Sequence, residues 1–175
     1  VPDAFRTFQL GVASFTLGTV VVEVYTNGNF MIDLGFPYNR NFERSFSVQA
    51  TIFIGRGGFY FGVLNGATST RVPLITNGNF SPVLELGIGL AAGVGREFRA
   101  GILAGGAYVQ IEVVFQGVLG WFNPDSSGIA PARYYWAQGI VAIHGKVYGY
   151  VDFKIIKVSV SLEAYAQASA LFESY

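Results

Sequence analysis

Apolar and polar residues alternate strictly along much of this chain, and this period of two limits the possible folds more than any other feature. In residues 46–52 the apolar positions Phe46, Val48, Ala50 and Ile52 alternate with Ser47, Gln49 and Thr51. Successive side chains of an extended strand point to opposite faces, whereas a helix would bring every third or fourth residue together. The pattern therefore predicts strands with one apolar and one polar face.

The same alternation continues through residues 141–155 and, after a shift of one position at Ile155-Ile156, through residues 158–170. In the second segment the apolar positions are Val158, Val160, Leu162, Ala164, Ala166, Ala168 and Ala170. A one-residue shift moves side chains to the other face, so we expect a bulge, a bend or a tight reversal there. Residues 20–25 and 110–119 are also strand-like, because they are rich in β-branched and aromatic residues.

Turn signals fall between these segments. The dipeptides Asn27-Gly28, Asn65-Gly66 and Asn77-Gly78 favour tight hairpin turns. The clearest loop lies at residues 123–131, and it marks a weak internal break in what we expect to be a single β domain over residues 1–175. The chain lacks an initiator methionine, so we also consider that it is a fragment of a longer protein.

One short repeat is visible. The pentapeptide Thr-Asn-Gly-Asn-Phe occurs at residues 26–30 and again at 76–80. The first copy precedes Ile-Asp-Leu-Gly at residues 32–35, and the second precedes the similar Leu-Glu-Leu-Gly at 84–87. This predicts two copies of one hairpin unit, although two copies are weak evidence for a repeat architecture.

The composition narrows the functional classes. Basic and acidic residues balance at 11 each, so the chain lacks the positive charge expected of a nucleic-acid partner. Cysteine is absent, which excludes disulfides and thiolate chemistry. Charged residues make up only 13% of the chain, about half the usual share in soluble domains. Either another part of an assembly covers much of the surface, or the surface faces lipid.

The string Gly87–Ala92 has the spacing G-x-G-x-x-A of a dinucleotide-binding turn. A strand-like segment precedes it, and another ends at Glu112, where an acid would bind a ribose hydroxyl. The helix required between them would contain five glycines, each costing about 1 kcal/mol relative to alanine. These are Gly93, Gly95, Gly101, Gly105 and Gly106. We keep an oxidoreductase fragment only as a further alternative and expect no cofactor.

No set of residues predicts catalysis or metal binding. His144 is the only histidine, and one histidine makes a metal site only with several carboxylates beside it. Five acids lie on predicted strands without a spacing that pairs them as in a glycosidase. They are Asp33, Glu85, Glu112, Asp152 and Glu163. The aromatic groups 121–122 and 134–136 fit core packing better than sugar stacking or an interfacial belt.

Residues 151–166 and 53–60 together resemble segments of very long, β-rich bacterial proteins of uncharacterised function. This resemblance implies a fragment of a large assembly without known catalysis, and it assigns no functional residues.

These observations predict an all-β fold of long, mostly antiparallel strands in a strongly curved sheet, as a barrel, a sandwich or a folded-over trough. The function expected is a non-enzymatic structural or binding module of a larger bacterial assembly, with other segments or copies as partners and an extracytoplasmic location favoured. An apolar sheet interior would enclose lipid or another hydrophobic ligand. Its expected lining is Leu162, Ala164, Ala166, Ala168 and Ala170. The alternative is an outer-membrane-type β-barrel, against which we weigh Glu173, because it shares a face with the last aromatic residue.

Overall fold

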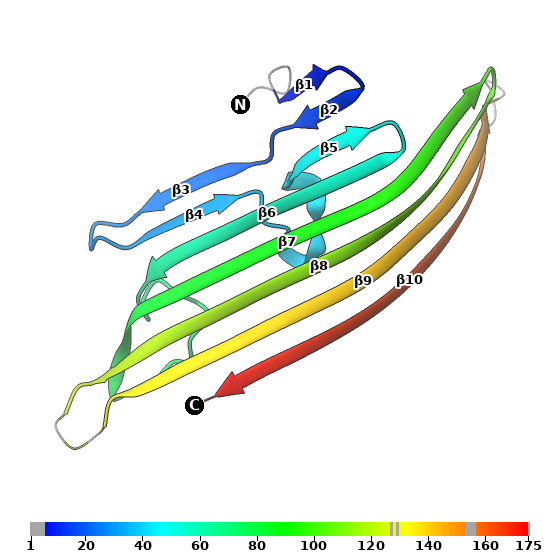
Figure 1. Cartoon of the computed structure of the whole chain (residues 1–175). Helices are drawn as coiled ribbons and strands as arrows, with labels where there is room; N and C mark the ends of the chain where they lie inside the picture. Colours follow the sequence, from blue (N-terminus) through cyan, green and yellow to red (C-terminus); the bar gives the residue numbers. More distant parts are fainter. Residues whose placement is uncertain (1–5, 127, 129, 153–156, 175) are drawn as a thin grey trace.

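The chain forms one large antiparallel sheet that is not closed (Figure 1). The computed structural model describes residues 6–126, 128, 130–152 and 157–174. Strands account for 74% of the chain, which confirms the predicted all-β fold. They are β1 (Thr7–Leu10), β2 (Ala13–Thr16), β3 (Val20–Val24), β4 (Phe30–Leu34), β5 (Phe46–Ala50), β6 (Phe53–Leu64), β7 (Gly78–Ala100), β8 (Leu103–Pro124), β9 (Ala132–Asp152) and β10 (Lys157–Ser174). Two 3₁₀ helices, η2 (Tyr38–Arg40) and η3 (Phe42–Arg44), lie between β4 and β5.

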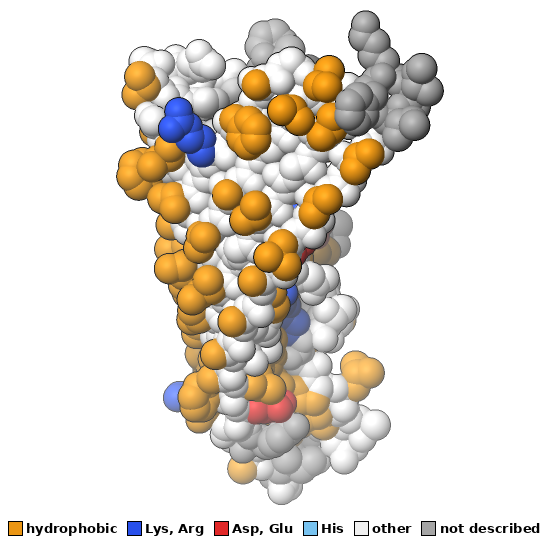
Figure 2. Space-filling model, turned by 90° about the vertical axis from the view of Figure 1, so that its right-hand side faces the viewer, with side chains coloured by type: hydrophobic (Ala, Val, Ile, Leu, Met, Phe, Trp, Pro, Cys, Tyr) orange, Lys and Arg blue, Asp and Glu red, His pale blue; other side chains and the backbone are white. Residues whose placement is uncertain are grey.

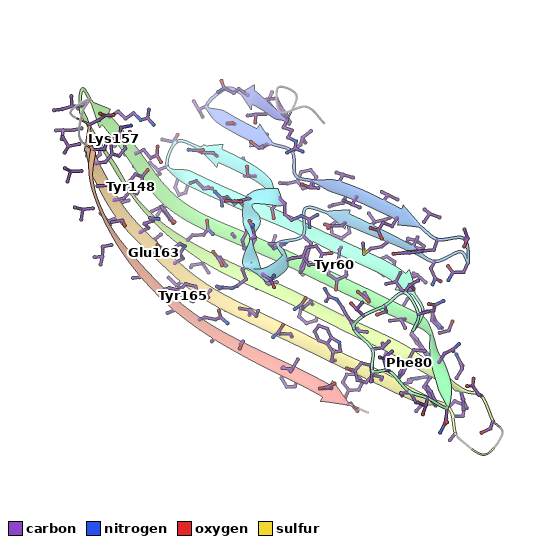
Figure 3. The ribbon with its side chains drawn as sticks, turned by 180° about the vertical axis from the view of Figure 1, so that it is seen from behind. Tyr60, Phe80, Tyr148, Lys157, Glu163 and Tyr165 are labelled. Carbon is purple, nitrogen blue, oxygen red and sulfur yellow. The ribbon has the colours of Figure 1, made fainter. Side chains whose placement is uncertain are left out.

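Strands β6 to β10 form the body of the sheet, and each pairs with the next in sequence. β4 and β5 pair one after the other along the free edge of β6, opposite residues 59–63 and 53–57. β3 extends the sheet beyond β4, while β2 and β1 extend it beyond β5. Between β4 and β5 the chain leaves this edge, and residues 35–45 fold over one face of the sheet (Figure 3). We call residues 35–45 the insert.

The central strands are unusually long. β7 has 23 residues and β8 has 22, against a common length of about five or six. At about 3.3 Å per residue, β8 alone extends over roughly 70 Å. Figure 1 shows the long strands bending along their length. The sequence-based expectation of long antiparallel strands in a curved sheet agrees with this architecture.

The alternation gives the sheet two unlike faces. The insert and the loop of residues 65–77 cover the first, which we call the insert face; the other is the open face (Figure 3). On β8, Val114 and Val118 point to the insert face and are buried, whereas Val113 points to the open face and is 45% exposed. Figure 2 shows the side of the molecule that lies on the right in Figure 1, and hydrophobic side chains are spread over it. The open face extends from the front of Figure 1 around to this side, so it is convex.

The hydrophobic core lies entirely on the insert face in the described segments. One buried cluster joins the insert to the sheet and consists of Phe36, Phe42, Tyr60, Ala91 and Val114. The other joins the 65–77 loop to one end of the sheet and consists of Leu64, Val72, Phe80, Val83, Val118, Phe122 and Tyr134. The two inward-folded segments therefore provide the second layer that a sheet needs to bury a face.

All three predicted turn dipeptides lie at strand ends, but only one of them forms a tight hairpin. Asn27-Gly28 joins β3 to β4, and Gly28 has a φ of 84°. Asn65-Gly66 begins the 65–77 loop instead, where the Asn65 side chain accepts the backbone N–H groups of Ala67 and Thr68. Asn77-Gly78 leads from this loop into β7. The two copies of the pentapeptide repeat therefore adopt different structures.

The phase shift in the C-terminal alternation accompanies a reversal of the chain. Asp152 pairs with Lys157, and β10 then runs antiparallel to β9 over the whole length of β10. The shifted positions, Ile155 and Ile156, lie outside the described residues. The loop at 123–131 connects β8 and β9, which pair from Phe122 and Ala132 onward. Among the described residues, no helix is long and apolar enough to cross a membrane.

Candidate functional site

The glycine string Gly87–Ala92 lies inside β7 and serves as the docking position of the insert. Gly87 and Gly89 point to the insert face. A Cβ atom on Gly87 would lie 2.3 Å from the Tyr60 ring, and one on Gly89 would lie 2.2 Å from Cγ of Pro37. Because no side chain stands at either position, the insert packs directly against the strand. No helix follows the string, so the phosphate-binding turn considered from the sequence is not formed here.

Short-range polar contacts hold the ends of the insert. The buried carboxylate of Asp33 accepts the backbone N–H of Phe36 at 2.9 Å and forms an ion pair with Arg44 at 2.7 Å. The hydroxyl of Ser45 donates to the carbonyl of Gly35 at 2.6 Å. The first and last residues of the insert are thereby tied together, so the excursion closes like a loop on the sheet edge.

Arg71, from the 65–77 loop, contacts several polar and aromatic side chains on the insert face of the sheet. Its guanidinium donates to Gln116 Oε1 at 2.9 Å and lies 3.3 Å from a carboxylate oxygen of Glu85. It also lies over the rings of Tyr60 and Trp136, at 4.9 and 5.8 Å from their centroids. The indole N–H of Trp136 donates to the carbonyl of Arg71 at 3.0 Å.

A polar cavity of about 530 Å³ opens beside Arg71, between the insert and strands β8, β9 and β10. Polar and aromatic side chains from all of these elements line it. They include Tyr38, Arg40, Gln116, Trp136, Gln138 and Gln167. Burial, together with the nearby Asp33 carboxylate, raises the pKa of Tyr38 to about 12. A volume of this size suits a small molecule.

His144 belongs to a second polar group on the insert face. Its Nε2 contacts Glu163, and Lys146 lies 3.6 Å from the same carboxylate. The contact with His144 lowers the pKa of Glu163. The ring of Tyr108 meets the imidazole edge-to-face at 5.4 Å. Among the described residues, no three acidic or histidine side chains group as metal ligands do.

Each of the five acids singled out in the sequence faces a basic side chain within ion-pair distance. The pairs are Asp33–Arg44, Glu85–Arg71, Glu112–Arg40, Asp152–Lys157 and Glu163–His144, the last joined by Lys146. The negative charge of each of these insert-face carboxylates is therefore balanced by a neighbouring basic side chain. Glu173 also points to this face and accepts the hydroxyl of Tyr134 at 2.7 Å, while Tyr175 lies outside the described residues.

The open face carries a wide apolar band across the four longest strands. Its charged residues are Arg96 on β7 and Arg133 on β9, and apolar positions continue beyond Arg96 with Phe98, Leu103, Val147 and Val158. Between the two arginines the described open-face positions of β8 and β9 hold glycine, aliphatic and aromatic residues, and Ser174 of β10 is a polar residue on this face, level with Tyr135. On β8 these are Val109, Ile111, Val113, Phe115, Gly117 and Leu119, and on β9 they are Tyr135, Ala137, Gly139, Val141, Ile143 and Gly145. Many of these side chains are about half exposed, including Ile111 and Ile143 at 51% each.

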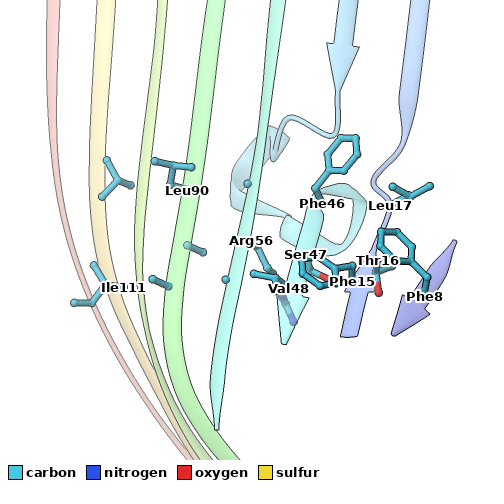
Figure 4. Close-up of a pocket in the computed structure, with 15 residues that line it drawn as sticks. Phe8, Phe15, Thr16, Leu17, Phe46, Ser47, Val48, Arg56, Leu90 and Ile111 are labelled. Carbon is cyan, nitrogen blue, oxygen red and sulfur yellow. The ribbon is translucent and has the colours of Figure 1, made fainter. Parts of the chain in front are cut away.

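An apolar groove crosses this band near β6 (Figure 4). Gly55 and Gly57 form its floor, because they present no side chain on the open face. Aromatic and aliphatic side chains from both sides of β6 form its walls. They include Phe15, Phe46, Val48, Leu90, Ile111 and Val113. The groove has a volume of about 820 Å³.

The predicted apolar lining of β10 lies on this open face. Leu162, Ala164, Ala166, Ala168 and Ala170 are all exposed, and they share the face with Val141 and Ile143 of β9. Leu162 and Ala164 border a shallow groove of about 560 Å³. This placement differs from the inner lining expected from the sequence. On the insert face β10 carries Glu163, Tyr165 and Gln167, and these residues are exposed as well.

The aromatic groups noted in the sequence divide between the two faces. Phe122 and Tyr134 are buried in the core under the 65–77 loop, and Trp136 lies against Arg71. Tyr135 is 48% exposed on the open face, where the register also places Trp121, next to Arg133. The predicted core packing is therefore found for Phe122 and Tyr134 but not for Trp121 and Tyr135.

Sequence reasoning missed the residues around the polar cavity. Gln116 and Gln167 lie in segments predicted as strands, and the alternation of residues 158–170 places Gln167 on the polar face. Gln138 lies outside the predicted strand at 141–155. Arg40 and Arg71 come from segments without a periodic pattern. Only the fold brings these arginines to the glutamines, across 45 residues for Arg71 and Gln116.

Comparison with known proteins adds no relative. No family model matches the chain, and neither the curated proteins nor the solved structures contain a significant match.

Proposed function

We propose that this chain is a non-enzymatic structural unit that forms part of the wall of an outer-membrane-type β-barrel assembly. Its open face lies against lipid, and its insert face looks into an aqueous interior that the insert and the 65–77 loop partly fill. The observation that carries this proposal is the division of the sheet into an exposed apolar face and a charged, covered face. A soluble sheet has the opposite arrangement, with its apolar face covered.

The height of the apolar band supports this proposal. Arg96 is level with Ala107 of β8, and Arg133 is level with Trp121, fourteen residues further along the same strand. At about 3.3 Å per residue this distance is roughly 46 Å along the strand. A tilt of about 45°, usual for membrane strands, reduces the height between the two arginines to about 33 Å, close to the ~30 Å hydrocarbon core of a bilayer. The apolar positions beyond Arg96 would lie at and above the membrane surface at that end.

The residues at the ends of the band also fit an interface between lipid and water. Trp121 and Tyr135 lie on the open face beside Arg133. Phe98 lies beside Arg96 at the other end and is 60% exposed. Amphipathic aromatic rings collect at membrane surfaces, and arginine extends its charge into the headgroups. The long apolar stretch between the arginines would be costly to leave in water.

In a membrane, the free edges of the sheet would have to pair with further strands. β10 has 18 residues, is exposed along nearly its whole length and pairs only with β9 among the described strands. Unpaired backbone groups at an edge are not tolerated within lipid. Closure would therefore use strands from another copy or from further segments of a longer chain, which agrees with the larger extracytoplasmic assembly expected from the sequence.

The two tryptophans permit a direct test, because the chain contains only Trp121 and Trp136 and they point to opposite faces. The full chain would be reconstituted in vesicles whose lipids carry bromine on the acyl chains, a contact quencher of indole fluorescence. In Trp136→Phe the remaining Trp121 should be strongly quenched. In Trp121→Phe the remaining Trp136 should not, since it lies behind the sheet beside Arg71.

A second candidate function is favoured by the groove at Gly55 and Gly57. In that case the open face packs on a protein partner or holds a hydrophobic ligand in a water-soluble assembly. The same experiment separates the two. A chain that stays in solution without detergent, with neither tryptophan quenched, would refute the membrane proposal in favour of this one.

A further inference from the structure

Two hydrogen-bond relays run across the insert face, and each begins at an arginine. In the first, Arg71 donates to Gln116 Oε1 at 2.9 Å, and Gln116 Nε2 donates to Gln138 Oε1 at 2.8 Å. An arginine has only donors, so it fixes the orientation of the Gln116 amide, and Gln116 then fixes that of Gln138. The Gln138 carbonyl oxygen is thereby occupied and its NH₂ group remains.

The second relay ends in the same way. Arg40 of the insert donates to the hydroxyl of Tyr165, and this hydroxyl donates to Gln167 Oε1. The orientation of the Gln167 amide is therefore also set by an arginine, and its NH₂ group remains. Within the described part of the chain, neither the Gln138 nor the Gln167 amide nitrogen has a hydrogen-bond partner.

Both relays end in one place. Gln138 and Gln167 line the polar cavity of about 530 Å³ beside the insert, and Arg40 and Arg71 line it as well. Each arginine has a glutamate beside it. Glu85 lies 3.3 Å from Arg71, and Glu112 lies 3.7 Å from Arg40. The cavity therefore needs no highly charged ligand, but it offers N–H donors that positively charged groups polarise.

The rest of the lining is apolar. Phe36, Tyr38 and Trp136 present ring surface to the same cavity. A ligand that suits the site would combine a compact apolar body with a strong acceptor for the N–H donors of the lining. A carboxylate accepts several hydrogen bonds and donates none when ionised.

We propose that this cavity binds a small organic carboxylate, with the acid group at the amide nitrogen of Gln138, the apolar body against Trp136, and Gln167 on the side of the cavity toward Arg40. The site lies on the insert face, so it does not depend on whether lipid or protein covers the open face. In a wall around an aqueous interior it would hold a solute within that interior.

Isothermal titration of the full chain with benzoate tests this proposal, with benzyl alcohol as a comparison that keeps the ring and lacks the acid. Benzoate should bind at least about tenfold more tightly than benzyl alcohol. Gln138→Glu and Gln167→Glu each replace the free donor by a like charge and should each weaken benzoate binding by about tenfold or more. Gln138→Met, which removes the donor without adding charge, should weaken it in the same direction.

Gln49→Glu is the matched control, because it adds the same charge at an exposed position of β5 that does not line the cavity. It should bind benzoate like the unmodified chain. Far-ultraviolet circular dichroism of each variant checks that the sheet is retained. Equal affinities for benzoate and benzyl alcohol, no benzoate binding at tens of millimolar, or unchanged binding by folded Gln138→Met would overturn the proposal.

Discussion

Tyr60 carries a hydroxyl group that is buried without a hydrogen-bond partner among the described residues, although its ring packs on both sides. Burial also raises the pKa of this phenol. An unsatisfied buried hydroxyl is costly, because its hydrogen bonds to water are lost and not replaced. We expect Tyr60→Phe to stabilise the fold by about 1 kcal/mol, since the ring contacts with Phe36 and Arg71 remain.

The midpoint of chemical denaturation measures this effect. Tyr135→Phe serves as the control, because Tyr135 is half exposed on the open face and its hydroxyl can reach solvent. That change should alter the free energy of unfolding by less than about 0.5 kcal/mol. A loss of stability in Tyr60→Phe would mean that the hydroxyl has a partner after all.

Gly89 is required by the close approach of the insert. A Cβ atom at this position would lie 2.2 Å from Pro37, so Gly89→Ala should force the insert away from β7. We expect a loss of about 1–3 kcal/mol in the free energy of unfolding, the usual cost of overpacking. Thermal unfolding of the variant beside the unmodified chain measures it.

Gly139 is the matched control for Gly89, because it also lies inside a long strand but has no atom within 4 Å of a Cβ built on it. Gly139→Ala should leave stability unchanged or raise it by up to about 1 kcal/mol, since alanine loses less backbone entropy on folding. If alanine changes the free energy of unfolding equally at both glycines, contact with the insert is not the reason why position 89 requires glycine.

At the level of single residues, the alternation predicts which face a side chain occupies but not what that face touches. The sequence correctly groups His144, Lys146 and Asp152 opposite Val141 and Ile143. It does not reveal that the insert covers part of the polar side. Covering depends on contacts between residues far apart in the chain, such as Arg40 with Tyr165 across 125 positions.

The insert is the element that distinguishes this sheet from a plain meander. The ionisation of Tyr38, which belongs to the insert, reports whether the insert is packed on the sheet. The pKa of this phenol is raised to about 12, against about 10 in an unfolded chain. The folded state therefore retains the proton over a range in which the unfolded state loses it. The resulting contribution to stability is complete below pH 10 and is lost as the pH rises through 12.

Tyrosinate absorbance measures this difference. In the unmodified chain, Tyr38 should ionise at a higher pH than free tyrosine, and Tyr38→Phe should remove part of this late phase. The same variant should also show a weaker decline in unfolding free energy between pH 10 and 12. A late phase of the same size in Tyr38→Phe would mean that other phenols account for it.

Among the elements, the strands could be predicted from the sequence and the insert could not. The described parts of the alternating segments 141–155 and 158–170 lie in β9 and β10, and the segment 46–52 lies in β5 up to Ala50, with Thr51 and Ile52 in the turn to β6. The insert contains no periodic pattern, and its hydrophobic residues Phe36 and Phe42 could equally have begun another strand. Its position follows from Gly87 and Gly89, which the sequence presented as a candidate phosphate-binding turn.

For the whole molecule, the sequence predicts one apolar and one polar side to the sheet but does not predict which is inside. The same alternation suits a soluble trough with an apolar interior and a membrane wall with an apolar exterior. The choice depends on where the connecting segments fold. In this chain both the insert and the 65–77 loop cover the polar side, so the apolar side is left as the exterior.

Charge scanning along β8 distinguishes a lipid-facing exterior from one exposed to water. Val113 lies near the middle of the apolar band and Val109 near its Arg96 end, and the two are 45% and 51% exposed on the same face. In lipid, Val113→Arg should cost about 2–4 kcal/mol and Val109→Arg about 0–1 kcal/mol, because the cost of a charge depends on depth. Denaturant titration of each variant folded into vesicles measures both.

In water these two variants should behave alike, because an exposed valine replaced by arginine usually changes stability by less than about 0.5 kcal/mol. The comparison is internal, since residue type, strand, face and exposure are matched and only the distance from Arg96 differs. A graded cost that falls from Val113 to Val109 would therefore report the bilayer itself. Two small and equal effects in vesicles would contradict the membrane wall and assign the open face to a protein partner.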